Sequence, residues 1–181
     1  MKKIIFILVM LSFLTTNSKS SYKKLAYDFS FKDLDGSVIK LSDYKNNVLL
    51  VTNVASRCGF TSQYEDLQNV WERYGKKGLV VIGVPSNSFN QELGSNKEVK
   101  NFCEAKFGIS FPMMQIVEVK GESAHPFYIW AKKNHGKAAI PKWNFHKIII
   151  GKDGKVFDTF SAMTNPKSKK FISSIETALK K

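Results

Sequence analysis

Cysteine is scarce in this chain of 181 residues, which contains only Cys58 and Cys103. The fold therefore has to rest on a hydrophobic core rather than on covalent staples, and 181 residues are enough to bury one. A structural disulfide between the two is one interpretation, but no loop needs stapling. The three histidines, His125, His135 and His146, lack metal-ligand spacing. We therefore expect neither a metal site nor a cofactor.

Acidic residues are also few: 15 Asp and Glu stand against 28 Lys and Arg, which gives a formal net charge of +13. The lysines are scattered over predicted helix faces and turns and are not interleaved with aromatic residues. This pattern is typical of a solvated surface, so we expect no nucleic-acid partner. A weak attraction to anionic partners or membrane surfaces stays open. No internal repeat or low-complexity linker divides the chain.

Long hydrophobic runs are absent except at the N-terminus, where residues 4–14 are apolar apart from one serine and follow two lysines. Ser18 and Ser20 offer small residues at positions −3 and −1 of a cleavage site. The run is too short to span a bilayer comfortably. We predict that residues 1–20 are a signal peptide for export to the periplasm or the exterior, followed by a single domain over 21–181. An uncleaved membrane anchor is the alternative.

The rest of the chain alternates between strand and helix patterns. The predicted strands are 29–31, 38–41, 48–54, 79–85, 145–150 and 156–160. Helical spacing of apolar residues follows Ser62, Ser95 and Pro126, and recurs at the C-terminus. This order predicts an α/β protein with a thioredoxin-like fold, in which a central mixed sheet is flanked by helices and preceded by an N-terminal β-hairpin.

Cys58 lies where the buried strand 48–54 should hand over to a helix. A sulfur at the N-terminal end of a helix feels its partial positive charge and unpaired N–H groups, which favour the nucleophilic thiolate over the thiol. Ser62 and Glu65 have the spacing of a capping box, so we expect them to begin that helix. The position predicts sulfur chemistry at Cys58, and a small buried hydrophobic residue is the alternative.

Three separated motifs carry a resemblance to a known family. They are NVASRCGFT at 53–61, PSNSFNQE at 85–92 and WNFHK at 143–147. In this order they resemble the glutathione peroxidase family, and the resemblance runs from about residue 25 to the C-terminus. It implies a thioredoxin-like fold, in agreement with the pattern of strands and helices, and the reduction of peroxides.

The resemblance also implies a catalytic group. The family's cysteine or selenocysteine, glutamine, tryptophan and asparagine fall on Cys58, Gln91, Trp143 and Asn144. The second motif has one residue fewer between Phe89 and Gln91 than in many members. A cysteine rather than a selenocysteine at position 58 is similar to the thiol branch, whose members mostly take electrons from thioredoxin-like proteins and not from glutathione.

The chemistry of peroxide reduction suits these residues. An indole N–H and two amides can stabilise the thiolate and polarise the peroxide, and the product is a sulfenic acid at Cys58. A second thiol must then condense with it, and Cys103 matches the resolving cysteine of some members. Cys103 lies on the apolar face of the helix 95–106, where packing is the alternative role. We expect that helix to open when the disulfide forms.

The sequence thus predicts an antioxidant thiol peroxidase that reduces hydrogen peroxide and organic or lipid hydroperoxides, recycled by a thioredoxin-like protein or glutathione. A thiol-disulfide exchanger or peroxide-sensing relay is an alternative, although Thr61 stands where a Cys-x-x-Cys motif would have its second cysteine. A noncatalytic binding module with a thioredoxin fold is another. The short stretch 133–141 lacks the assembly insertion of tetrameric members, which favours a monomer.

Overall fold

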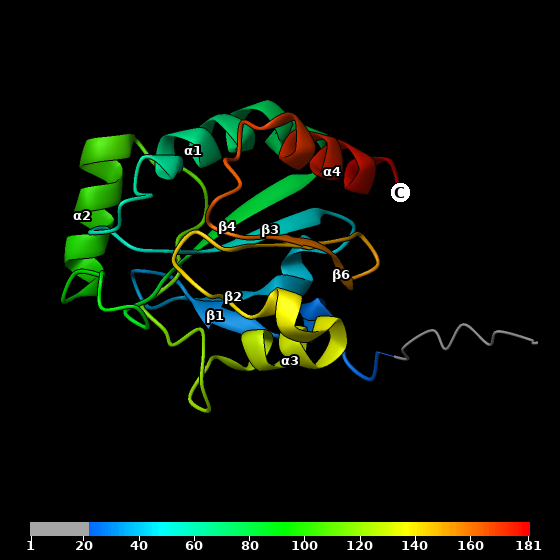
Figure 1. Cartoon of the computed structure of the whole chain (residues 1–181), viewed down its shortest axis with the longest axis horizontal. Helices are drawn as coiled ribbons and strands as arrows, with labels where there is room; N and C mark the ends of the chain where they lie inside the picture. Colours follow the sequence, from blue (N-terminus) through cyan, green and yellow to red (C-terminus); the bar gives the residue numbers. More distant parts are fainter. Residues whose placement is uncertain (1–21) are drawn as a thin grey trace, which may run out of the picture.

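A four-stranded mixed sheet forms the centre of the computed structural model, which describes residues 22–181 (Figure 1). Its strands, in the order β4-β3-β5-β6, are β3 (Val48–Val54), β4 (Leu79–Pro85), β5 (Lys147–Ile150) and β6 (Val156–Phe160). β3 runs parallel to β4 and antiparallel to β5, which is itself antiparallel to β6. The predicted signal peptide over 1–20 lies outside the described residues.

Helices cover both faces of this sheet. They are α1 (Gln63–Tyr74), α2 (Asn96–Phe107), α3 (Pro126–His135) and α4 (Lys169–Lys180). A separate hairpin pairs β1 (Ser30–Lys32) with β2 (Val38–Lys40). Figure 1 shows α1 and α4 on one face, α3 and the hairpin on the other, and α2 at one end of the molecule. The predicted α/β architecture with its N-terminal hairpin is confirmed.

The largely apolar sequences of β3 and β4 follow from this layering, because every residue of both strands is buried. Successive side chains of a strand point to opposite faces. Val48 and Leu50 accordingly enter the core beneath α1 and α4, whereas Leu49 and Val51 enter the core beneath α3. The strand that leads to Cys58 is therefore fixed from both sides.

The limits of α2 agree with the sequence prediction. The Ser95 hydroxyl accepts a hydrogen bond from the Glu98 N–H at 3.3 Å, which caps the first turn. Gly108 ends the helix with φ of +57°, a conformation that glycine adopts at little cost. Val99 and Cys103 are buried, so the helix presents its apolar face to the core as predicted.

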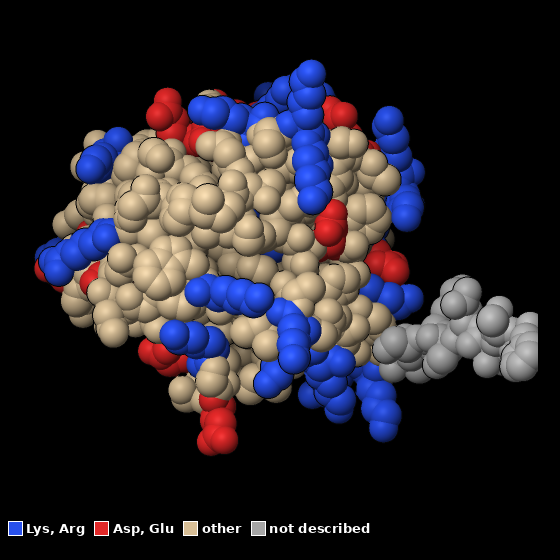
Figure 2. Space-filling view, in the orientation of Figure 1, with Lys and Arg blue, Asp and Glu red and all other residues tan. Residues whose placement is uncertain are grey.

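The surface carries the excess of basic residues. Figure 2 shows lysine and arginine side chains spread over one face, with several gathered near the first described residues and acidic side chains interspersed. Among residues 22–181, no helix is both long and apolar enough to cross a membrane.

Candidate active site

Cys58 sits in a tight turn between the end of β3 and the start of α1. The Phe60 N–H donates a hydrogen bond to the Cys58 sulfur at 3.4 Å. The Cys58 N–H in turn donates to the Thr61 hydroxyl oxygen at 3.1 Å. These two hydrogen bonds fix the position of the Cys58 side chain and place a backbone donor at its sulfur.

The predicted capping box at Ser62 is wrong. Ser62 has helical dihedral angles, φ −58° and ψ −20°, and its side chain makes no capping hydrogen bond. The chain already turns helically before it, because the Gln63 N–H donates to the Phe60 carbonyl at 2.9 Å and the Tyr64 N–H to the Thr61 carbonyl at 3.1 Å. The first two N–H groups of α1 are therefore satisfied by carbonyls of the turn that holds Cys58.

Two amides from separate motifs meet beside this turn. Asn144, fully buried ahead of β5, donates from Nδ2 to Gln91 Oε1 at 3.0 Å. Gln91 belongs to the loop after β4, and its carbonyl accepts the Arg57 N–H at 2.9 Å. The structure thus brings Gln91 and Asn144 together and joins them to the residue that precedes Cys58, despite the shorter second motif.

Trp143 lies at the surface of the loop before β5, next to Asn144. Its side chain is 42% exposed and contacts Phe89, with ring centroids 5.4 Å apart. An indole that merely filled the core would be covered, so Trp143 is not a core residue. Within the described residues the indole N–H makes no hydrogen bond, which leaves it available to a substrate oxygen.

Asn53 of β3 anchors the loop that carries Trp143 and Asn144. Its side-chain amide donates to the Trp143 carbonyl at 3.1 Å, and its carbonyl accepts the Phe145 N–H at 2.6 Å. Phe145 has φ of +62°, a costly conformation for a residue with a side chain, and it turns the loop inward. Sequence reasoning gave Asn53 no role, although a buried asparagine within an apolar strand was a signal.

Cys103 is buried in α2 at 2% exposure, and neither cysteine is in a disulfide. Burial raises the pKa of the Cys103 thiol to about 11. The thiol borders a cavity of about 430 Å³ between α2 and the turn that joins β1 to β2. Cys58 does not line that cavity, although both cysteines belong to the same hydrophobic core cluster.

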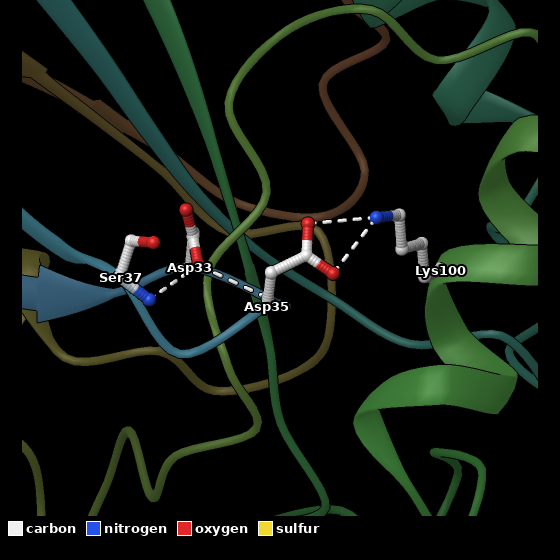
Figure 3. A network of polar contacts seen from close by, with 4 residues as sticks. All are labelled: Asp33, Asp35, Ser37 and Lys100. Carbon is white, nitrogen blue, oxygen red and sulfur yellow. Dashed lines mark hydrogen bonds and ion pairs between the residues drawn. The ribbon is translucent and has the colours of Figure 1, made fainter.

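An ion pair spans the mouth of this cavity. Lys100 of α2 reaches both carboxylate oxygens of Asp35, at 2.7 and 2.8 Å (Figure 3). Asp33 holds the turn by accepting the N–H groups of Asp35 and Ser37 at 3.0 and 2.8 Å. The helix that carries Cys103 is thereby tied to the N-terminal hairpin by one exposed contact.

No group of three or more His, Cys, Asp or Glu in the described part of the chain could hold a metal ion. His146 precedes β5 and is buried, and burial lowers its pKa to about 4, helped by Lys147 and Lys142. It is therefore neutral at physiological pH. The groups that the structure gathers at this site are a thiol, two amides and an exposed indole.

Comparison with known proteins identifies relatives of this chain. The glutathione peroxidase family model matches residues 26–132. A glutathione peroxidase of Lactococcus lactis subsp. cremoris is 43% identical over 144 residues, covering 77% of this chain and 91% of the relative. A hydroperoxy fatty acid reductase of Synechocystis sp. is 42% identical over 149 residues, covering 77% and 88%. A thioredoxin/glutathione peroxidase of Escherichia coli is 38% identical over 173 residues, covering 83% and 94%.

Solved structures agree with the fold. The crystal structure of Trgpx in its apo form superposes with a TM-score of 0.70 at 35% identity, covering 87% of this chain and 97% of that one. A thiol:disulfide interchange protein of the thioredoxin family from Chlorobium tepidum TLS gives 0.62 at 22% identity, covering 83% and 92%. The second likeness concerns the fold alone, and the predicted thioredoxin-like fold is confirmed.

Proposed function

This chain belongs to the glutathione peroxidase family, and from that premise we propose that it reduces hydrogen peroxide and organic or lipid hydroperoxides through Cys58, with Cys103 as the resolving thiol. It is a thiol peroxidase, an oxidoreductase that takes a peroxide as substrate and a thiol as reductant. Relatives that are named a hydroperoxy fatty acid reductase and a thioredoxin/glutathione peroxidase support these substrate classes.

The proposed cycle begins with attack by the Cys58 thiolate on one peroxide oxygen. The O–O bond breaks and the leaving oxygen takes up a proton, so the products are water or an alcohol and a Cys58 sulfenic acid. The Cys103 thiol then attacks the oxidised sulfur, a disulfide forms, and water leaves. A thioredoxin-like dithiol, or two glutathione molecules, returns both cysteines to thiols.

The hydrogen bond between Asn144 and Gln91 is the observation that carries the proposal. Because Gln91 Oε1 is occupied by Asn144, the amide nitrogen of Gln91 is left to donate elsewhere. The Arg57 N–H holds this pair beside the Cys58 turn. Fixed donors near the sulfur can stabilise both the thiolate and the developing charge on the leaving oxygen.

A steady-state assay of peroxide consumption tests the proposal. The reduced protein is supplied with hydrogen peroxide, a fatty acid hydroperoxide or an alkyl hydroperoxide, each with thioredoxin plus its reductase or with glutathione plus its reductase. We expect turnover with at least one pair and faster recycling by thioredoxin, and none in Cys58→Ser. Peroxide turnover near the wild-type rate in Cys58→Ser would remove Cys58 from the mechanism. Disulfide exchange without peroxide consumption would identify an exchanger, and inactivity in both assays would identify a binding module.

We also propose that the chain is exported, on the strength of the basic and apolar leader over 1–20. Expression of the full chain followed by mass spectrometry of the product tests this. A mature N-terminus at or near residue 21 in the periplasmic or secreted fraction is expected. An intact leader in the membrane fraction would instead identify an anchor, and an intact leader in the cytoplasm would remove the proposal.

A monomer is the assembly we propose, because the segment between α3 and β5 is short. The helix ends at His135, and a single 3₁₀ turn, Gly136–Ala139, leads towards Trp143 without an inserted arm. Light scattering coupled to size exclusion is expected to give the mass of one chain. A mass of four chains would contradict this.

A further inference from the structure

A buried carboxylate underlies the loop that carries Cys58. Glu92 is 6% exposed, and its Oε1 accepts the N–H groups of Ser56 at 3.0 Å and Leu93 at 2.8 Å. Its second oxygen, Oε2, is buried and makes no hydrogen bond of normal geometry, with the equally unpartnered hydroxyl of Ser56 close by. No salt bridge within residues 22–181 involves it. Burying a carboxylate oxygen without a partner is costly, so its retention calls for a reason beyond holding the loop.

The Tyr64 hydroxyl lies in the same buried region. Its ring packs between Phe107 of α2 and Phe145, each with a centroid separation of 5.3 Å. The hydroxyl is buried and makes no hydrogen bond of normal geometry within the described residues. It is nevertheless close enough to stabilise a Cys103 thiolate, and it also lies near Glu92.

Resolution of the sulfenic acid presents a chemical difficulty that this cluster can meet. Burial raises the pKa of Cys103 to about 11 while α2 is closed, and even an ordinary cysteine, with a pKa of about 8.5, is mostly a thiol at neutral pH, whereas only the thiolate is a strong nucleophile. A nearby proton acceptor would remove that obstacle. Burial also raises the pKa of Glu92, against the Ser56 hydroxyl, two backbone N–H groups and Arg57, and so makes it a better proton acceptor than an exposed glutamate.

We propose that Glu92 accepts the proton of the Cys103 thiol as Cys103 attacks the Cys58 sulfenic acid, with Tyr64, whose hydroxyl lies near both, as a positioning residue. The sulfur–sulfur bond forms as the sulfur–oxygen bond of the sulfenic acid breaks. The departing hydroxide takes up the proton that Glu92 received, so water is released and Glu92 returns to its carboxylate. This inference rests on the proposed function.

The hydrogen bond between Glu92 and Ser56 explains how Glu92 could act as the base for Cys103 even when α2 opens. Its carboxylate is bonded to Ser56, two residues before Cys58, and not to α2. Glu92 therefore stays with Cys58 when α2 moves, and a thiol arriving at Cys58 comes to the loop that Glu92 holds. The other ionisable groups that face this cluster are Arg57 and Glu104.

The test is the rate of Cys58–Cys103 disulfide formation after a pulse of peroxide, followed by acid quench and mass spectrometry between about pH 6 and 9. Glu92→Gln keeps an oxygen for the Ser56 and Leu93 N–H groups but accepts no proton. We expect disulfide formation to slow by about tenfold or more at pH 7, since general bases contribute about 10²–10⁴-fold. We also expect the variant's rate to rise with pH, because it depends on prior ionisation of Cys103, while the wild-type rate stays flatter.

Glu104→Gln is the matched control, because Glu104 is an exposed glutamate beside Cys103 in α2. The Glu104→Gln variant should form the Cys58–Cys103 disulfide at the wild-type rate. Glu92→Asp keeps a carboxylate and should keep the flatter pH profile, so it covers the case in which Glu92→Gln fails to fold. A wild-type rate and profile in Glu92→Gln, or an equal slowing at every pH, would overturn the inference. Failure of the wild type to form sulfenic acid or the disulfide would instead overturn the proposed function.

Discussion

An exposed tryptophan next to a buried asparagine is the residue pair that most clearly distinguishes a working site from a packed loop. Trp143 packs against Phe89 while its N–H stays unpaired within the described residues. Trp143→Phe keeps most of that packing and removes only the donor. We predict a loss of about 10²–10³-fold in the rate of peroxide reduction, the usual cost of removing one preorganised donor.

The control for this substitution is Trp130→Phe. Trp130 is buried, and its N–H donates to the Lys24 carbonyl at 2.8 Å, in α3 and away from the motifs. The Trp130→Phe substitution should lower the free energy of unfolding and leave the rate of peroxide reduction unchanged. A rate for Trp143→Phe within about threefold of wild type would mean that Trp143 serves packing and that the donor argument fails.

His146 makes the fold sensitive to acid. Its pKa is about 4 in the folded protein against 6.5 for the ordinary side chain, because burial and the adjacent Lys147 oppose its charge. The unfolded chain therefore binds a proton between these values while the folded chain does not. The free energy of unfolding therefore keeps its full value above pH 6.5 and decreases as the pH falls towards 4. The total decrease due to His146 is about 3 kcal/mol.

Urea unfolding at pH 7 and pH 4.5 tests this prediction. His146→Leu removes the titration and leaves no unpaired ring nitrogen, so its stability should fall less over that interval than the wild-type stability. An equal fall in both proteins would assign the acid sensitivity to other groups.

Sequence reasoning located Cys58 and the two amides because their motifs are distinctive, yet it could not show that Gln91 bonds to Asn144. That contact joins residues 53 positions apart, and no local pattern encodes it. Asn53 and Glu92 were missed for the same reason. Both lie within the motifs, but their roles depend on which backbone groups the fold brings to them.

At the scale of elements, α2 is the part of the fold whose attachment matters most for resolution. It carries Cys103 and is tied to the hairpin by the exposed pair of Lys100 and Asp35 (Figure 3). Exposed ion pairs contribute little and are screened by salt. We predict that Lys100→Ala increases amide hydrogen exchange in α2 a few-fold at low salt, and that the difference shrinks in about 0.5 M NaCl.

Lys97→Ala provides the comparison, because Lys97 is exposed on the same helix and forms no salt bridge within the described residues. It should leave the exchange of α2 amides close to wild type. Equal exchange in the two variants at low salt would show that the ion pair does not restrain the helix.

The strands were predictable almost to the residue, since β3 and β4 are apolar runs between turn residues. The start of α1 was not. A capping box was expected at Ser62, but the turn over 58–61 already satisfies the first N–H groups. Hydrogen bonds to a cysteine sulfur and a threonine hydroxyl are specific to this site, and general capping rules do not anticipate them.

For the whole molecule, the layered fold places three motifs at the ends of neighbouring strands. β3 leads to Cys58, β4 to Gln91, and the loop before β5 holds Asn144, so the pairing of β3 with both other strands brings them to one edge of the sheet. Ligand and catalytic sites of open α/β sheets commonly lie at such an edge. Cys103, in α2, lies on the same side of the molecule and is buried among apolar residues.

The most direct test of this account is mass spectrometry of the reduced protein after about one equivalent of peroxide. We predict a disulfide that links Cys58 to Cys103 in the wild type, and in Cys103→Ser a persistent sulfenic acid on Cys58. A wild type that holds only a sulfenic acid, or only a mixed disulfide with glutathione, would contradict the role of Cys103. Oxidation that spares Cys58 would contradict the account as a whole.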